Sequence, residues 1–373
     1  MRYFNYTVTT AAGWWGRRSF LRHWWRFYGR DPYWVPPPYH ALGRTLRPGT
    51  AGGAGDRQPQ LVVLEALPRP GRKSEEGAVL PLAGELERPV GLAIALREAS
   101  GQALLALPRV VNDAETVVRL LEAVAEATGA QTVVGPTHLS PLLGAGALAS
   151  HWNRPPPLHT PYNPPYLPGL LREVMEQAAT GHLYALPVAD APEPASEGLA
   201  AIVPFRPARL ASELLPLLNA AAEGALFTPA HVDASFLLRW LAQYPLSGYL
   251  ALVDDEPAGF ILLQPDLAPL QRRSGGGRTF VGRLWVRLAL ARRKPEAGRV
   301  VLGAVAPPWR RQGIGRQLLE AARAHARSEG WERLTTGPLE QASPAAALLS
   351  AAGAVAEQRY ELFRWQAPVR GWW

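Results

Sequence analysis

The stretch from Val300 to Arg327 constrains the fold of this 373-residue chain more than any other. It opens with the β-branched pair Val300-Val301 and reaches Pro307-Pro308, which lack the backbone donors that a strand ladder needs. Around and beyond Gly315, apolar residues recur at helical spacing. These positions are Ile314, Leu318, Leu319, Ala322 and Ala326. The pattern predicts a strand that ends in a tight turn and continues as an amphipathic helix.

Two glycines, Gly313 and Gly315, fall where this helix is expected to begin. Without side chains there, a ligand can approach the backbone, and the unpaired N–H groups of the first turn favour an anion. Arg310, Arg311 and Arg316 surround the turn and suit a pyrophosphate better than a single carboxylate. The alternative is a plain strand-to-helix turn, and no Gly-Lys-Ser/Thr follows that would make it a Walker loop.

The spacing Arg-x-x-Gly-x-Gly, entered from a strand that closes with Val-x-Pro, resembles the acyl-CoA motif of the GNAT superfamily of N-acyltransferases. Arg310, Gly313 and Gly315 stand at its defining positions. The resemblance implies acetyl-CoA or another acyl-CoA as co-substrate, and direct acyl transfer to an amine of a small molecule or peptide. It also implies a CoA-binding set made of Gly303, Ala304, Val305, Arg310, Arg311, Gln312, Gly313, Ile314, Gly315 and Arg316.

The two halves of the chain show the same order of expected strands and helices, which indicates a duplicated unit. Leu120-Leu121-Glu122-Ala123 matches the residues from Leu318 to Ala321, and Gly135-Pro136 matches Gly337-Pro338. We therefore expect an α/β (α+β) fold of two tandem GNAT-like modules, each a mixed, mostly antiparallel, twisted sheet flanked by helices. The expected boundaries are residues 1–190, a linker at 191–198, and 199–373.

The N-terminal copy is expected to have lost its CoA site. Aligning the two Leu-Leu-Glu-Ala segments places Glu115 opposite Gly313 and Val117 opposite Gly315. Side chains then stand where a pyrophosphate needs bare backbone, and Asp113 and Glu115 would repel phosphate. This copy is predicted to shape the acceptor cleft. Farther along, the pattern predicts a helix from about Gly169 to Ala178 and a strand from His182 to Leu186.

The catalytic residues are less well marked than the CoA motif. Many GNAT members carry a tyrosine that protonates the thiolate, and the matching position here is Leu349. Ser350, Tyr360 or water could substitute, and Glu340 could receive the amine proton, although a solvated loop carboxylate is the alternative. The resemblance also implies that backbone N–H groups near Gly303 and Ala304 polarise the thioester carbonyl. A non-catalytic CoA-sensing module is the rival interpretation, favoured by Leu349.

Composition excludes several other classes of protein. The chain has no cysteine, so disulfides and thiolate metal sites are absent, and its eight histidines lack metal-ligand spacing, so no metal is expected. A polar N-terminus and the lack of a run of about 18 apolar residues indicate no secretion signal and no transmembrane segment, so a cytoplasmic location is expected. Nothing in the sequence sets the oligomeric state.

A basic insert at residues 270–297 precedes the motif strand. From about Phe280 it interleaves apolar residues with arginines, which predicts an amphipathic basic helix suited to an anionic partner such as RNA or a membrane face. The alternative is a helix packed on its own module with a solvated arginine face. The net charge of +8 allows such partners, but CoA is also anionic and could account for part of the excess.

Overall fold

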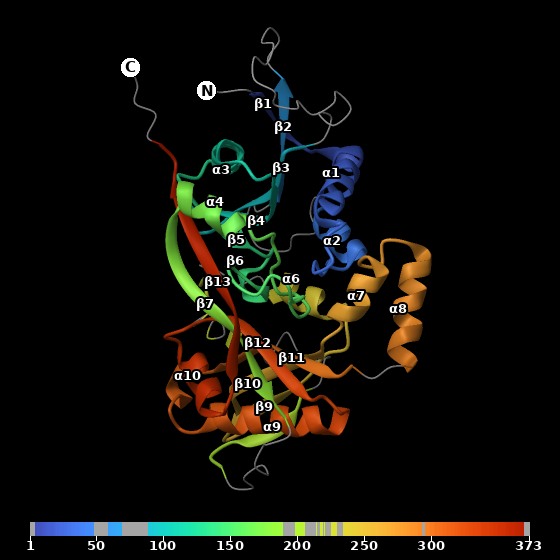
Figure 1. Ribbon diagram of the computed structural model, residues 1–373. Coiled ribbons are helices and arrows are strands. Elements are labelled where there is room, and N and C mark those ends of the chain that lie inside the picture. The colour runs from blue at the N-terminus through green and yellow to red at the C-terminus, as the bar shows by residue number, and fades with distance from the viewer. Residues whose placement is uncertain are drawn as a thin grey trace.

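The computed structural model describes residues 4–47, 59–68, 89–188, 198–205, 214, 217–218, 220, 225–229, 234–292 and 295–368 (Figure 1). The predicted linker therefore lies, apart from residue 198, outside the described residues, and the module boundaries stay a prediction. Within this part of the chain, no helix is long and apolar enough to cross a membrane.

The first half of the chain contains most of one sheet and the helices that cover it. Its elements are β1 (Phe4–Thr10), α1 (Gly13–Tyr28), α2 (Tyr39–Thr45), β2 (Gln60–Pro68), β3 (Gly91–Arg97), β4 (Ala103–Val110), α3 (Ala114–Thr128), β5 (Thr132–Thr137), η2 (Pro141–Leu143), β6 (Ala147–Leu148), α4 (Leu167–Val174) and β7 (Glu176–Pro187).

The second half follows the same order, with two extra helices before its fourth strand. Its described elements are β8 (Ala201–Pro204), α6 (Ala234–Leu241), β9 (Ser247–Val253), β10 (Glu256–Pro265), α7 (Ala268–Ser274), α8 (Phe280–Arg292), β11 (Ala297–Val305), η4 (Pro307–Trp309), α9 (Ile314–Glu329), β12 (Arg333–Glu340), α10 (Pro344–Ala351) and β13 (Val355–Gln366).

All of these strands join one continuous sheet. The order is β1-β2-β3-β4-β5-β13-β7-β12-β11-β10-β9-β8, with β6 paired to β13. Only β4 with β5 and β11 with β12 run parallel, and the other pairs are antiparallel. The expected mixed, mostly antiparallel sheet flanked by helices is therefore confirmed.

The last strand of each half lies in the other half's part of the sheet. Strand β13 inserts beside β5, with Phe363 opposite Gly135, while β7 pairs with β12, with Leu186 opposite Leu334. The two exchanged strands pair with each other at the centre of the sheet. The side chains follow the exchange: Phe363 is buried in the N-terminal core that contains α3, and Leu186 in the C-terminal core that contains α9.

The expected helix up to Ala178 is wrong in its last turn, because α4 ends at Val174 and β7 begins at Glu176. Glu176 and Gln177 pair with Arg364 and Phe363 of β13. This pairing between distant segments outweighs the local helical pattern.

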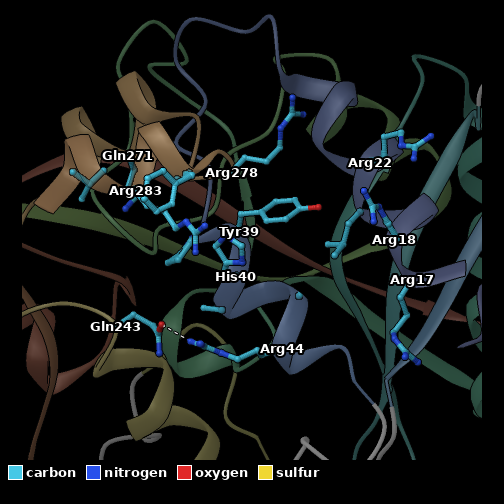
Figure 2. Close-up of a pocket in the computed structure, with 18 of the residues that line it drawn as sticks. Arg17, Arg18, Arg22, Tyr39, His40, Arg44, Gln243, Gln271, Arg278 and Arg283 are labelled. Carbon is cyan, nitrogen blue, oxygen red and sulfur yellow. Dashed lines mark hydrogen bonds between the residues drawn. The ribbon is translucent and has the colours of Figure 1, made fainter. Parts of the chain in front are cut away.

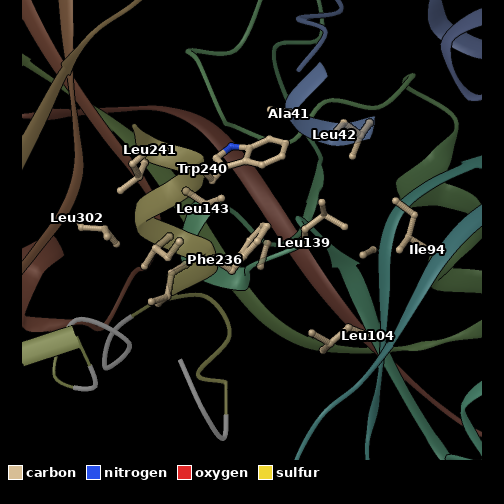
Figure 3. Packing of buried hydrophobic residues seen from close by; sticks show 14 of the residues in the cluster. Ala41, Leu42, Ile94, Leu104, Leu139, Leu143, Phe236, Trp240, Leu241 and Leu302 are labelled. Carbon is tan, nitrogen blue, oxygen red and sulfur yellow. The ribbon is translucent and has the colours of Figure 1, made fainter. Parts of the chain in front are cut away.

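A third apolar cluster joins the two halves. Figure 3 shows Leu42, Ile94 and Leu104 from the first half, with Phe236, Trp240, Leu241 and Leu302 from the second, in the same packed region. Each of these side chains is almost fully buried. The burial of apolar area from both halves in one cluster stabilises their association.

Two buried histidines lie within this junction. Trp240 Nε1 donates to His159 Nδ1 at 3.1 Å, so the His159 Nε2–H is left to donate to Gln264 Oε1 at 3.2 Å, and the ring is neutral. The His138 ring stands 5.0 Å from the Trp240 ring. Burial lowers the pKa of His138 to about 3 and, with His138 and Arg299 nearby, lowers the pKa of His159 well below its ordinary value.

The strand exchange predicts that a core substitution loosens the opposite half. Phe363→Ala should cost about 3–5 kcal/mol and speed hydrogen exchange in α3, while Leu186→Ala should cost about 2–5 kcal/mol and speed it in α9. Hydrogen–deuterium exchange with peptide resolution measures both. The opposite result, in which each variant loosens only the half that contains its own sequence, would contradict the exchange.

The buried histidines predict acid destabilisation. Their folded-state pKa values lie below the unfolded value near 6.5, so the unfolded chain binds protons that the folded chain excludes, and stability falls as pH drops below about 6.5. Each histidine should remove about 1.4 kcal/mol between pH 7.5 and 5.5. Denaturant titrations at both pH values test this, and His138→Phe, which keeps a ring but cannot titrate, should remove about half of that loss.

Candidate functional site

Strand β11 separates from its parallel neighbour β12 after three residue pairs. Residues 297–299 pair with 333–335, and β12 then continues along β7. Beyond Arg299, β11 keeps β10 on its other side as far as Val305. Among the described residues no strand pairs with its β12-facing edge from Val300 to Val305, and Gly303 is exposed there. Such an edge offers unpaired backbone groups to a ligand.

The chain passes from β11 through a compact turn to α9, whose N-terminus is left uncapped. Arg311 and Gly313 take left-handed backbone, with φ of 60° and 84°, and Gly313 is the N-cap without a side-chain hydrogen bond. The first backbone bond of the helix runs from the Gln317 N–H to the Gly313 carbonyl at 3.1 Å. The N–H groups of Ile314, Gly315 and Arg316 therefore have no carbonyl partner within the helix, and this end of its dipole attracts an anion.

Polar side chains hold this turn in shape. Arg310 Nε donates to the Val305 carbonyl at 3.1 Å, and Gln312 Nε2 donates to the Pro308 carbonyl at 3.0 Å. These bonds tie both ends of the turn to its own backbone. The arginine that defines the motif thus braces the turn, a role that the sequence did not indicate.

The charge at the turn comes mainly from two exposed arginines. The Arg311 side chain is exposed, and Arg316 is 73% exposed although its Nε lies 2.8 Å from Glu320 Oε1. The bond to the largely buried Glu320 uses Nε, so the exposed end of the Arg316 guanidinium can still contact a phosphate.

The two motif glycines have different surroundings. A Cβ at Gly313 would meet no atom within 4 Å, whereas one at Gly315 would lie 3.3 Å from Leu348 Cδ2 and 3.8 Å from Val305 Cγ2. Gly313 therefore leaves open space at the helix end. Gly315 instead allows α9 to pack closely against α10 and β11. The contact of either glycine with a ligand stays a prediction.

The candidates for proton transfer differ in their exposure. Ser350 is exposed on α10, and Glu340 is exposed at the end of β12. Leu349, at the position where the family often has tyrosine, is buried in the C-terminal core, and its neighbour Leu348 is the residue that approaches Gly315.

Tyr360 is fully buried next to Arg299, at the point where β11 and β12 separate. Its hydroxyl donates to the Pro161 carbonyl at 3.3 Å and lies 3.4 Å from Gln358 Oε1. Burial raises its pKa, so the hydroxyl stays protonated at neutral pH. This placement serves packing and hydrogen bonding between the two halves, and a catalytic role for Tyr360 stays a prediction.

In the N-terminal half the corresponding helix end is occupied by a side chain. Asp113 is the N-cap of α3, and its Oδ2 accepts from the Thr116 N–H at 2.7 Å and from the Thr116 hydroxyl at 2.6 Å. The buried sides of α3 and α9 match in the alignment that the sequence suggested, with Leu120 and Leu121 opposite Leu318 and Leu319. In that alignment α3 begins two residues earlier than α9, and Asp113 caps its end. A carboxylate therefore accepts from the first turn of α3, where α9 has no side-chain cap.

Side chains also cover the equivalent strand, β4. Trp24 Nε1 donates to the Leu107 carbonyl at 2.8 Å, and the Arg109 guanidinium lies 3.9 Å from the Trp24 ring centre and 4.0 Å from that of Tyr28. A cavity of only about 60 Å³ remains beside them. Nothing in the sequence indicated that Arg109 packs on these rings, and its burial lowers its pKa to about 10.

Comparisons with known proteins agree with this architecture. Residues 213–353 match the acetyltransferase (GNAT) family, and no curated protein matches the chain. A tandem GNAT protein from the clavulanic acid biosynthesis pathway shares the fold with a TM-score of 0.56 at 12% identity, covering 99% of this chain and 100% of that one.

Two further solved structures extend the likeness over nearly the whole chain. A GCN5-related N-acetyltransferase from Sphaerobacter thermophilus gives a TM-score of 0.50 at 14% identity, covering 97% of this chain and 96% of its own. One from Anabaena variabilis gives 0.53 at 12%, covering 96% and 72%. At these identities the likeness establishes the fold. The chain thus has a tandem GNAT fold, and its residues 213–353 match the model of the acetyltransferase (GNAT) family.

Proposed function

We infer that the C-terminal module binds an acyl-CoA, most simply acetyl-CoA, where β11 turns into α9, and transfers its acyl group to an amine. The observation that carries this proposal is the uncapped end of α9 at Gly313, directly after a strand edge without a partner. A pyrophosphate fits the free N–H groups and the exposed Arg311 and Arg316, while an amide-bearing arm fits the edge from Val300 to Val305.

The proposed chemistry is a direct transfer on that edge. The amine nitrogen attacks the thioester carbon, the C–S bond breaks, and CoA leaves as a thiolate. Backbone N–H groups near Gly303 would stabilise the oxyanion. The nitrogen must lose a proton, for which Glu340 is the candidate acceptor, and the thiolate gains one from water or Ser350.

The N-terminal module is proposed to shape the acceptor side without binding CoA. Asp113 and the packed Arg109 occupy the positions that a second CoA would need. A CoA-sensing module is the rival function, supported by the burial of both Leu349 and Tyr360. A cytoplasmic location is part of the proposal. The motif implies the GNAT reaction, and its co-substrate, acyl-CoA, is an intracellular metabolite.

A carboxylate at the helix end should block CoA. Gly313→Asp would add a negative charge beside the pyrophosphate and weaken binding by about 1–4 kcal/mol, the repulsion of two unit charges roughly 4 Å apart at the protein surface. Gly313→Asn is the matched control, because asparagine has the same shape and also tolerates left-handed backbone. Calorimetry should find one acetyl-CoA per wild-type chain and a much larger loss for Asp than for Asn. Two equivalent sites, or equal affinities of the two variants, would contradict the proposal.

Turnover separates an enzyme from a sensor. Release of free CoA with a panel of amines, peptides and aminoglycosides should be detectable, and Tyr360→Phe should keep kcat within about twofold while lowering stability by about 1 kcal/mol, the worth of one hydrogen bond. A loss of about 10²-fold in kcat at unchanged CoA affinity would instead assign Tyr360 the acid role. Tight CoA binding without turnover on any amine would favour the sensing module.

A further inference from the structure

A wide cationic cavity lies on a different part of the molecule, between α1 and α2 of the first half and α7 and α8 of the second. Its volume is about 1170 Å³ (Figure 2). None of the described residues that line it is an aspartate or a glutamate. Eight arginines line it: Arg17, Arg18, Arg22, Arg26, Arg44, Arg47, Arg278 and Arg283.

The charge of this region exceeds the net charge of the whole chain. Residues 13–47 and 268–292 together contain thirteen arginines and one acidic residue, Asp31, whereas the chain as a whole stands at +8. Asp31 already accepts hydrogen bonds from the Tyr162 hydroxyl at 2.7 Å and from the Tyr33 N–H at 2.9 Å. The rest of the sequence is therefore net acidic, and the positive charge is concentrated in these two segments, which supply the arginines of the cavity.

The helices that carry these arginines are fixed to each other by neutral contacts. The Tyr39 N–H donates to the Gly276 carbonyl at 2.9 Å, and Trp25 Nε1 donates to the Gly275 carbonyl at 3.3 Å. A Cβ at Gly276 would come within 2.6 Å of Trp25, so the turn after α7 packs closely on α1. The cations are thus held side by side by backbone contacts despite their repulsion. Burial, with Arg283 and Arg44 nearby, also lowers the pKa of His40 on the cavity wall.

An unpartnered apolar surface borders this cavity. On α8, Phe280 is 72% exposed and Val281 is 73% exposed. Leu284, Trp285 and Leu288 are also exposed. The five residues are spaced one or four positions apart along α8, so all of them lie on one side of the helix, within an arc of about 140°. Across the cavity, Trp14 and Trp15 are exposed at the start of α1, and Trp14, Phe280 and Leu284 all line the cavity.

This combination identifies the partner by its chemistry. Arginines alone would suit RNA or a membrane equally, but valine and leucine cannot stack on bases as aromatic side chains do. A helix with an apolar side, flanked by arginines and tryptophans, matches the boundary between lipid headgroups and acyl chains. We propose that this face is a docking surface for a membrane rich in anionic phospholipid, with headgroup phosphates in the arginine cavity and the apolar side of α8 inserted between the lipids.

Vesicle flotation with the full chain tests the proposal. The wild type should float with vesicles of phosphatidylcholine and phosphatidylglycerol in a 3:1 ratio at low salt, but not with phosphatidylcholine alone. Arg278→Glu/Arg283→Glu should lower the bound fraction about tenfold or more, because two charges are reversed and the net charge falls by four units. The matched control is Arg327→Glu/Arg364→Glu, the same charge change on exposed residues of α9 and β13, which should stay within about twofold of wild type.

The apolar contribution needs its own variant. Phe280→Gln/Leu284→Gln/Trp285→Gln keeps the charge and a helix-compatible residue at each position, and should also lower flotation about tenfold. Thermal melting of each variant near the wild-type midpoint establishes that it is folded. The proposal is overturned if the wild type does not float with anionic vesicles, or if the arginine or glutamine variants float as well as the control. It is also overturned if the chain does not float but binds single-stranded RNA in the absence of vesicles, and the glutamine substitutions do not change that binding.

Discussion

The antiparallel pairing of β7 with β13 is the interaction on which the rest of the structure depends. Strand β13 already pairs with β5, and β7 with β12, so without the central pairing β13 and β7 would each end a sheet with an unpaired edge, a condition that folded proteins avoid. The pairing closes both edges at once, and the exchanged strands carry Phe363 and Leu186 into the opposite cores. Glu361 of β13, almost fully buried, adds an ion pair at 2.6 Å to Arg172 of α4. The two modules therefore share one continuous sheet, and each supplies a strand to the core of the other.

The same helix-and-strand arrangement is closed in one half and open in the other. At α3 the Asp113 carboxylate satisfies the first turn, whereas at α9 Gly313 provides no side chain. At β4, Arg109 is stabilised without a carboxylate by the faces of Trp24 and Tyr28. Its pKa near 10 still keeps it charged at neutral pH. Residues that fill a site also stabilise the fold, so the N-terminal copy has gained packing where the C-terminal copy keeps space for a ligand.

The sequence could predict the structural features that depend on residues close together in the chain. The turn at Gly313 and the helix that follows were predictable because glycine position and apolar spacing act within a few residues. The strand exchange was not, since β7 meets β13 across about half of the chain, and this pairing places Glu176 to Ala178, which were expected to be helical, in a strand. The sequence indicated only the basic insert, which is one side of the cationic cavity, because the insert lies far in sequence from the arginines of α1. The complete cavity exists only once the two halves pack.

The insert and the candidate site are joined through β11, and Arg299 fixes the start of this strand. Helix α8, which also contacts α7, ends at Arg292, and β11 begins at Ala297. Arg299, buried two residues further on, donates to the Thr160 hydroxyl and to the Gly337 carbonyl, which ties β11 both to the N-terminal half and to β12. Breaking these bonds would leave a buried guanidinium unsatisfied, which is costly. The strand edge that leads to Gly303 is therefore anchored at its beginning by both halves of the chain.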